Sequence, residues 1–223
     1  MSVEKPKKKS SFLDDLQENT RFDRWVEFIS AIILALATVG TAWCGYQSAL
    51  WSGEKSGFSS DANSANLHAA QLANRAVLAD SRNVGLFVEW SAAYFQNDLE
   101  FANFLLERFP PELIVATEAW MALEPMKNPD APLSPFDMPE YRLEDLEASD
   151  ALIIQVEIDR AKASKASDTA DRYILLTVLF ASVLFFGGIS GKFKSQIIDL
   201  GMLAMAIVVF LGVILVLISY PII

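Results

Sequence analysis

Three long apolar windows constrain the fold of this chain more than any other feature. They cover residues 28–44, 173–189 and 197–218, and none carries an ionisable residue in its middle. Each is close to the roughly 20 residues that a helix needs to cross about 30 Å of hydrocarbon. The hydrophobic fraction of 52% is also high for a soluble chain of 223 residues. We therefore predict an all-α integral membrane protein with three transmembrane helices.

The positions of Lys and Arg predict how these helices are oriented. The spans are expected at 25–44, 173–190 and 197–219. Basic residues precede the first span and lie in the short turn between the other two: Lys5, Lys7, Lys8, Lys9, Arg21, Arg24, Lys192 and Lys194. Positive charge near the membrane is retained on the cytoplasmic side. The basic tail 1–24 and the turn 191–196 are therefore expected to be cytoplasmic, and residues 45–172 extracytoplasmic.

The intervening segment 45–172 is strongly acidic, with 21 acidic and 10 basic residues. A nucleic-acid partner requires a basic face that can neutralise phosphates. This charge balance therefore argues against nucleic acid and leaves the lipid bilayer and other proteins as expected partners.

The first span has an alternative interpretation as a cleaved signal peptide. Residues 40–42, Gly-Thr-Ala, have the small-x-small form of a cleavage site. The polar region before the apolar run is long for a signal peptide, however, so we favour an uncleaved anchor. Cys44, the single cysteine, cannot form an internal disulfide and is expected to be a small packing residue.

Small residues recur in alternating steps of four and three from the first span into the polar sequence that follows. The members expected to pack against another helix are Ala35, Ala42, Gly45, Ala49, Ser52 and Ser56. This spacing is typical of a helix face that meets a partner helix, and small side chains let the backbones approach closely. We predict one long helix that continues out of the membrane. A break at 52–60 is the alternative, because Gly53 and Gly57 disfavour a helix interior.

A second small-residue face precedes the second span. Its members are Ala163, Ala166 and Ala170, within a predicted helix at about 143–190. We expect the two long helices to run antiparallel with their small faces together, so that extensions of the first and second spans form an extracytoplasmic helical bundle. Four aromatic residues are expected as interfacial anchors: Trp25, Trp43, Tyr173 and Tyr220. The first two are about 27 Å apart along a helix, close to the separation of two aromatic belts.

The sequence of the segment 45–172 also predicts shorter helices and a loop. Aromatic and leucine residues recur at helical spacing over about 80–108, and Pro110 and Pro111 end that helix. A short helix is expected at 112–123. A Pro-rich loop at 125–139 follows, which is either a structural linker or a segment that docks a partner.

The search for catalytic chemistry is negative. One histidine, His68, and one cysteine cannot build an ordinary zinc site or a convincing Cys–His pair. The acidic cluster around 140–150 lacks the ligand spacing of a calcium loop and suits a helix N-terminus. We therefore predict no enzyme activity, no metal and no cofactor.

The stretch after the first span also carries a resemblance. Gly45, Tyr46, Gln47 and Trp51 form a short "GYQ…W" motif. With the order of spans, this chain resembles small uncharacterised bacterial membrane proteins of the domain-of-unknown-function type, which implies the bacterial inner membrane and no particular activity. We expect a non-enzymatic scaffold or accessory subunit that forms a homo-oligomer or joins another membrane protein. An extracytoplasmic sensor acting through a partner and an oligomeric channel are the alternatives.

Overall fold

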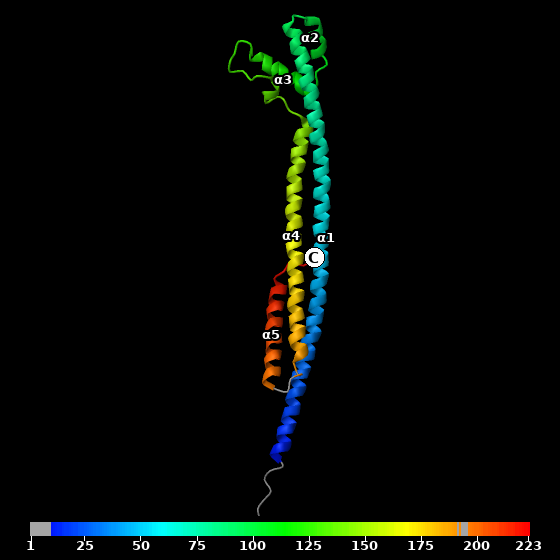
Figure 1. Ribbon diagram of the computed structural model, residues 1–223, viewed down its shortest axis with the longest axis vertical. Coiled ribbons are helices and arrows are strands. Elements are labelled where there is room, and N and C mark those ends of the chain that lie inside the picture. Colours follow the sequence, from blue (N-terminus) through cyan, green and yellow to red (C-terminus); the bar gives the residue numbers. More distant parts are fainter. Residues whose placement is uncertain (1–9, 191, 193–195) are drawn as a thin grey trace, which may run out of the picture. The chain divides into compact units, whose positions relative to one another are not determined.

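The computed structural model describes residues 10–190, 192 and 196–223, and this part of the chain is built from helices (Figure 1). The elements in chain order are α1 (Ser10–Phe95), α2 (Leu99–Leu106), α3 (Pro111–Ala122), the 3-10 helix η1 (Pro135–Asp137), α4 (Glu144–Ile189) and α5 (Gln196–Ile218). No strand occurs among these described residues, which confirms the all-α prediction. Residues 1–9 of the predicted tail 1–24 lie outside the described residues, and the rest of that tail belongs to α1.

Three of the helices are long and apolar enough to cross a membrane. They are α1 from Arg24 onward, α4, and α5 from Ile197 onward. Each contains one of the apolar windows identified in the sequence. Exposed side chains of these windows are mostly aliphatic or aromatic, as expected of surfaces that contact lipid.

The helix α1 has no break at 52–60, and it ends differently from the prediction. Gly53 and Gly57 both lie within its helical backbone. The predicted separate helix at 80–108 is wrong, because α1 itself continues to Phe95. A turn then follows in which Asn97 has a φ of 64°. The Asp98 carboxylate accepts a 3.1 Å hydrogen bond from the Phe101 N–H and caps the start of α2.

Prolines delimit α3 and the loop that follows it. Pro110 and Pro111 stand at its start, where a missing N–H costs no helical hydrogen bond. Just after its end, Glu124 has a φ of 47°. The loop 125–139 contains no α-helix, as its prolines predict, and the Trp120 indole N–H donates to the Pro132 carbonyl at 2.8 Å.

The chain divides into two compact units. Unit 1 comprises the chain up to Gly57 together with Lys162–Ile223, and unit 2 is Phe58–Ala161. Both α1 and α4 therefore contribute residues to each unit. These divisions lie within the predicted extracytoplasmic segment 45–172, not at the predicted membrane boundaries.

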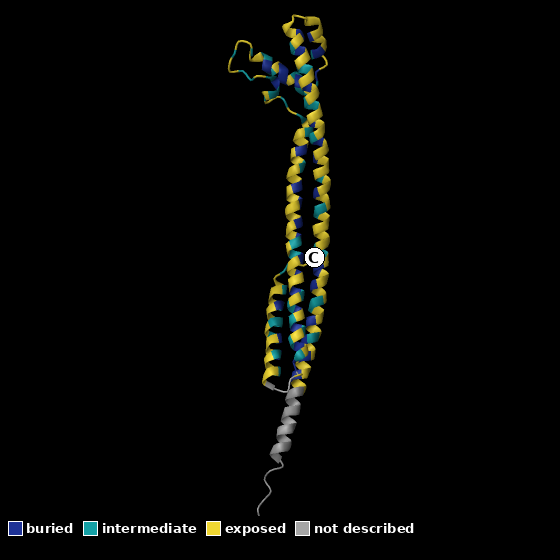
Figure 2. Ribbon diagram, in the orientation of Figure 1, coloured by how far each residue is buried: buried dark blue, intermediate teal, exposed yellow. Residues whose placement is uncertain are grey.

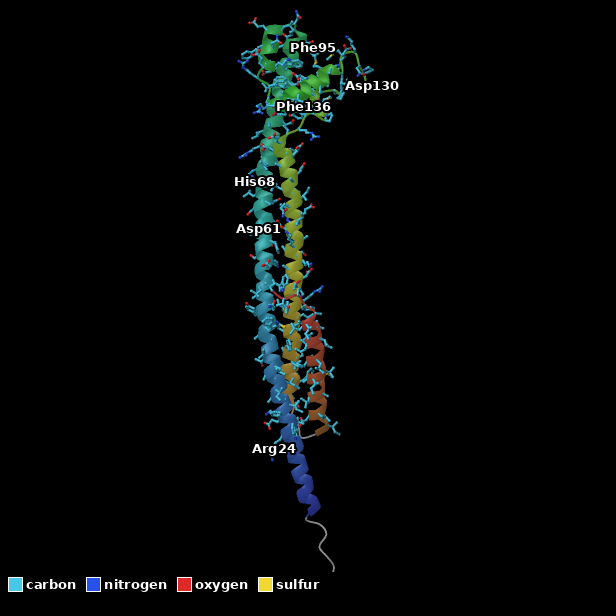
Figure 3. The ribbon with its side chains drawn as sticks, turned by 180° about the vertical axis from the view of Figure 1, so that it is seen from behind. Arg24, Asp61, His68, Phe95, Asp130 and Phe136 are labelled. Atoms are coloured by element: carbon cyan, nitrogen blue, oxygen red, sulfur yellow. The ribbon has the colours of Figure 1, made fainter. Side chains whose placement is uncertain are left out.

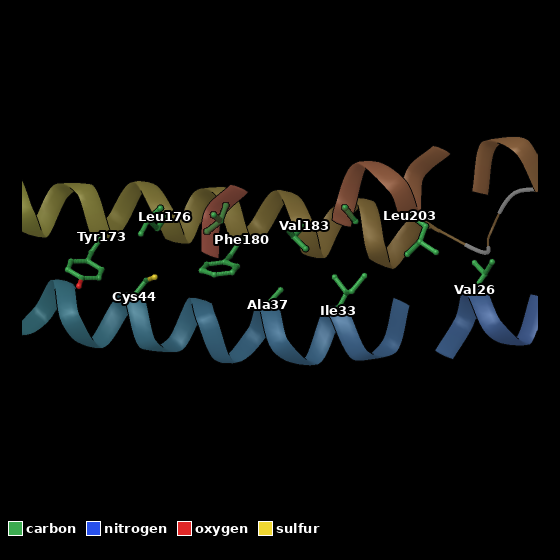
Figure 4. Packing of buried hydrophobic residues seen from close by; sticks show 11 residues of the cluster. Val26, Ile33, Ala37, Cys44, Tyr173, Leu176, Phe180, Val183 and Leu203 are labelled. Atoms are coloured by element: carbon green, nitrogen blue, oxygen red, sulfur yellow. The ribbon is translucent and has the colours of Figure 1, made fainter. Parts of the chain in front are cut away.

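The core of unit 1 is formed by three helices (Figure 4). Its fully buried members are Val26, Ile33, Ala37 and Cys44 from α1, Tyr173, Leu176, Phe180 and Val183 from α4, and Leu203, Ala206 and Val213 from α5. Ser30 lies against Ser190, whereas Cys44 lies at the level of Tyr173, so α1 and α4 run antiparallel here.

The core of unit 2 is aromatic. It contains Trp90, Ala93, Ala102, Leu105, Phe109 and Leu113. The Phe87 ring meets Trp120 and Phe136 edge-on, with centroid separations of 5.6 and 5.5 Å. Edge-to-face geometry places the positive edge of one ring on the negative face of another, which adds to the stabilisation from burial.

Candidate functional site

Within unit 1, one face of α1 is covered by the other helices and the rest is exposed (Figure 2). The covered face repeats in steps of four and three through Val26, Ser30, Ile33, Ala37, Cys44 and Gln47. Gly40 lies on this face, and a Cβ added there would be only 2.5 Å from the Phe180 ring. The close approach of α1 and α4 therefore depends on a residue without a side chain at position 40.

The small-residue face predicted on α1 lies elsewhere. Its members Ala35, Ala42, Gly45, Ala49, Ser52 and Ser56 are all exposed, whereas Ala163, Ala166 and Ala170 of α4 are buried. The structure therefore does not bring the two predicted small faces together, although the helices are antiparallel. The reason is that the neighbouring stripe of α1, with Val26 and Ile33, removes more apolar area from solvent.

The exposed small face of α1 is also free of close neighbours within the chain. A Cβ added at Gly45, Gly53 or Gly57 would meet no heavy atom within 4 Å. Large exposed side chains flank this face in the apolar window: Ile32, Leu36, Val39, Trp43 and Tyr46. The small-residue face is therefore a narrow, shallow strip with larger apolar side chains on both sides. Another helix can pack into a surface of this shape.

Polar contacts at one end of unit 1 tie the end of the described chain to α1 and α4. The Gln47 side chain donates to the Ile223 carbonyl at 3.1 Å, and its carbonyl oxygen accepts from the Ile223 N–H at 3.2 Å. The Pro221 carbonyl accepts from the Trp51 indole at 3.2 Å and from the Tyr173 hydroxyl at 3.0 Å. Sequence reasoning missed these roles, although a glutamine in phase with the buried stripe was a visible signal.

The predicted interfacial anchors have different environments. Trp25 and Trp43 are exposed, as an interfacial ring must be. Tyr173 is fully buried, so its assignment as an anchor is corrected: the ring packs against Tyr220 with a centroid separation of 5.6 Å and fills the helix interface. Tyr220 is half-buried.

Unit 2 contains a buried polar network. Asn83, which is completely buried, donates through Nδ2 to Glu112 at 3.1 Å and to the Tyr141 hydroxyl at 3.2 Å. The Tyr141 hydroxyl in turn donates to Asp80 at 2.9 Å. Burial raises the pKa of Tyr141 to about 12, with a smaller contribution in the same direction from the Asp80 carboxylate. This network joins α1, α3 and the loop before α4, and sequence reasoning did not find it.

The ionisable residues weighed in the sequence do not form a metal site. His68 is exposed on α1 (Figure 3). Among the described residues, no group of three His, Cys, Asp or Glu side chains could hold a metal ion. The acidic residues at the start of α4 lie at a helix N-terminus, where Glu147 pairs with Arg142 at 3.8 Å.

Two hollows occur in unit 2. The larger, about 1030 Å³, is a wide groove lined by both basic side chains, such as Arg82 and Arg142, and acidic side chains, such as Glu112 and Glu147. The smaller, about 200 Å³, is an aromatic cleft between the ends of α1 and α3. It is the more enclosed of the two and has a mainly apolar wall.

No family model, curated protein or solved structure matches this chain. No family is therefore assigned, and function has to be argued from the arrangement of residues described above.

Proposed function

We propose that this chain is a non-enzymatic scaffold or accessory subunit of the bacterial inner membrane, which assembles through the exposed small-residue face of α1. The observation that carries the proposal is that this face stays uncovered although α1 packs against α4 and α5 through its neighbouring stripe. The occupant is a second copy of this chain or a helix of another membrane protein.

Packing physics favours a helix as the occupant. Inside a bilayer there is no hydrophobic force between helices, so association depends on close van der Waals contact. Within the span, the face at Ala35 and Ala42 lets a second backbone come close, and the bordering side chain of Val39 can pack around it. The small face continues to Ser52 and Ser56, whose hydroxyls offer hydrogen bonds to a partner.

The mass of the full chain, extracted from its native membrane in mild detergent, tests this proposal. We expect a homo-oligomer or a stoichiometric complex with a second membrane protein, measured by light scattering with mass spectrometry. Gly45→Leu and Ala49→Leu should dissociate it, because leucine fills the strip without clashing inside the chain. Val208→Leu, which adds the same kind of bulk at an exposed position of α5, is the matched control. An unchanged mass in both test variants would rule out this interface.

The topology within the proposal has the N-terminus in the cytoplasm and residues 45–172 outside. It rests on the basic residues that flank the spans and on the acidity of the segment between them. Cys44→Ala supplies a cysteine-free background, in which Ser64→Cys and Lys192→Cys place one thiol on each side. In intact spheroplasts, a membrane-impermeant maleimide should label only Ser64→Cys; labelling of Lys192→Cys alone would invert the topology.

A second candidate function, an extracytoplasmic sensor that acts through a partner, is favoured by the aromatic cleft of unit 2. A ligand that binds only the folded chain stabilises it by an amount that grows with the logarithm of its concentration. Thermal unfolding of the full chain with and without candidate ligands therefore separates a sensor from a purely structural subunit.

A further inference from the structure

The aromatic cleft of unit 2 is formed by three short segments. The end of α1 contributes Trp90 and Tyr94, the end of α3 contributes Trp120 and Met121, and the turn after α3 closes one side. The Trp90 and Tyr94 rings stack with their centroids 5.4 Å apart. Trp90 belongs to the core of unit 2 and Trp120 packs on Phe87 at its border, so these two rings are held in place by packing, whereas Tyr94 is partly exposed.

The size of the cleft limits the class of ligand. Its volume of about 200 Å³ lies below the roughly 300–1,000 Å³ of pockets for drug-sized molecules. Since a water molecule takes about 30 Å³ of liquid, the cleft has room for a molecule that places about seven non-hydrogen atoms inside it. The mainly apolar wall requires most of that molecule to be hydrocarbon.

The two tryptophan side chains in the wall of the cleft are each only 6% exposed. The indole N–H of Trp120 donates to the Pro132 carbonyl, which ties that ring to the loop after α3. This part of the wall therefore offers a ligand aromatic ring surface.

The turn at the mouth of the cleft presents both charges. Glu124 and Lys127 line the cleft, and their charged groups lie 3.4 Å apart while remaining largely exposed. An exposed ion pair of this kind is weak, so Glu124 and Lys127 can separate and each can pair with an opposite charge on a ligand. Glu124 also occupies the left-handed position after a helix, where glycine is preferred. Strain of this kind is concentrated at functional sites.

We propose that this cleft binds a free amino acid with an apolar side chain. The side chain of the ligand occupies the space between Trp90, Tyr94 and Met121, its ammonium group pairs with Glu124, and its carboxylate pairs with Lys127. The site is made entirely of unit 2 residues, so it goes beyond assembly through α1 and holds whether or not that assembly exists.

Calorimetric titration of the full chain in detergent with L-leucine and L-phenylalanine tests the site. We expect saturable binding, and at least about tenfold weaker binding of N-acetyl-leucinamide, which keeps the side chain but lacks both charges. Glu124→Gln and Lys127→Gln should each weaken leucine binding by about fivefold. Glu107→Gln, an exposed carboxylate outside the cleft, is the control and should leave binding unchanged.

A variant that fills the cleft keeps the test independent of the charges. Ser91→Phe adds a ring at the wall and should abolish binding, while the unfolding temperature of the free protein stays close to that of the wild type. The absence of binding by either amino acid, equal binding of the capped analogue, or unchanged leucine binding in Ser91→Phe would each overturn the proposal. None of these outcomes depends on the oligomeric mass that tests the α1 interface.

Discussion

Units 1 and 2 are stabilised by different kinds of contact. Unit 1 has a mostly aliphatic core repeated along three helices, and its long-range side-chain hydrogen bonds gather near Gln47 and Ser190. Unit 2 has short helices and loops around stacked and edge-on rings, with a polar network at Asn83. A core between long helices is positioned by the same apolar contact repeated at every turn. A core closed by short helices and loops lacks that repeat, so ring contacts and hydrogen bonds position each segment.

The largest effect should come from removing a central ring of unit 2. Trp90→Ala should lower the free energy of unfolding by about 3–5 kcal/mol, because it leaves a cavity among packed rings. Chemical denaturation of the full chain, followed by near-ultraviolet circular dichroism, measures this loss. Tyr94→Ala is the control, since that ring is exposed. Equal losses in the two variants would contradict the aromatic core described here.

The two faces of α1 in unit 1 can be compared with a single substitution type. Gly40→Leu should destabilise the free chain by about 1–3 kcal/mol, because its side chain would overlap the buried Phe180 ring. Gly45→Leu should leave the unfolding midpoint of the monomer close to that of the wild type, because open space surrounds that position. Thermal unfolding in a detergent that keeps the chain monomeric measures both. If Gly45→Leu lowered the unfolding temperature more than Gly40→Leu, the face of α1 that packs against α4 would be the one with Gly45.

The contribution of the polar network of unit 2 to stability can be measured with Tyr141→Phe. Loss of the hydroxyl removes the hydrogen bonds with Asn83 and Asp80 and should cost about 1–2 kcal/mol. Denaturant midpoints at neutral pH give this difference directly. An equivalent change in unit 1, Tyr220→Phe, should cost less, since no side-chain hydrogen bond of Tyr220 occurs among the described residues.

The same tyrosine predicts a pH dependence. Its folded pKa is about 12, above the unfolded value of 10.0, so the contribution of the protonated hydroxyl is complete below pH 10 and is lost as pH rises through 12. The stability difference between wild type and Tyr141→Phe should therefore shrink between pH 10 and 12. A difference that stays constant over this range would show that the phenol is not held in its protonated form.

The smallest effect is expected at the strained turn. Glu124→Gly should raise the free energy of unfolding by up to about 1 kcal/mol, because glycine adopts a positive φ without steric cost. Asn97→Gly should change it less, since asparagine already tolerates this conformation. A destabilised Glu124→Gly variant would indicate that the carboxylate contributes more to the fold than the backbone strain removes.

Much of the fold could be predicted from the sequence because helical periodicity and prolines are local properties. The three apolar windows, the long helix at about 143–190 and the short helix at 112–123 all follow from such patterns. The end of α1 did not, because the turn depends on Asn97 and Asp98, whose conformations compete with continued helix.

The packing face of α1 was harder to predict because two stripes on different faces have the same repeat and are offset by one residue in the sequence. Ser30 and Ala31, or Cys44 and Gly45, are adjacent residues, and one residue turns a helix by about 100°. Spacing alone cannot decide which stripe meets α4, since that depends on the area each stripe buries against a particular neighbour. Contacts distant in sequence, such as Asn83 with Tyr141, leave no periodic trace at all.

The paired hydrogen bonds of Gln47 have a mechanical consequence for unit 1. The side-chain amide pairs with both the N–H and the carbonyl of the same residue, Ile223, so two hydrogen bonds favour one position of the segment after α5 along α1. Two apolar helices can otherwise shift by one turn relative to each other with little change in the area that they bury, because apolar contacts are not directional. Here a shift of one turn would break both bonds and also part Trp51 from Pro221. The Gln47 side chain therefore helps to fix the position of α5 along the axis of α1.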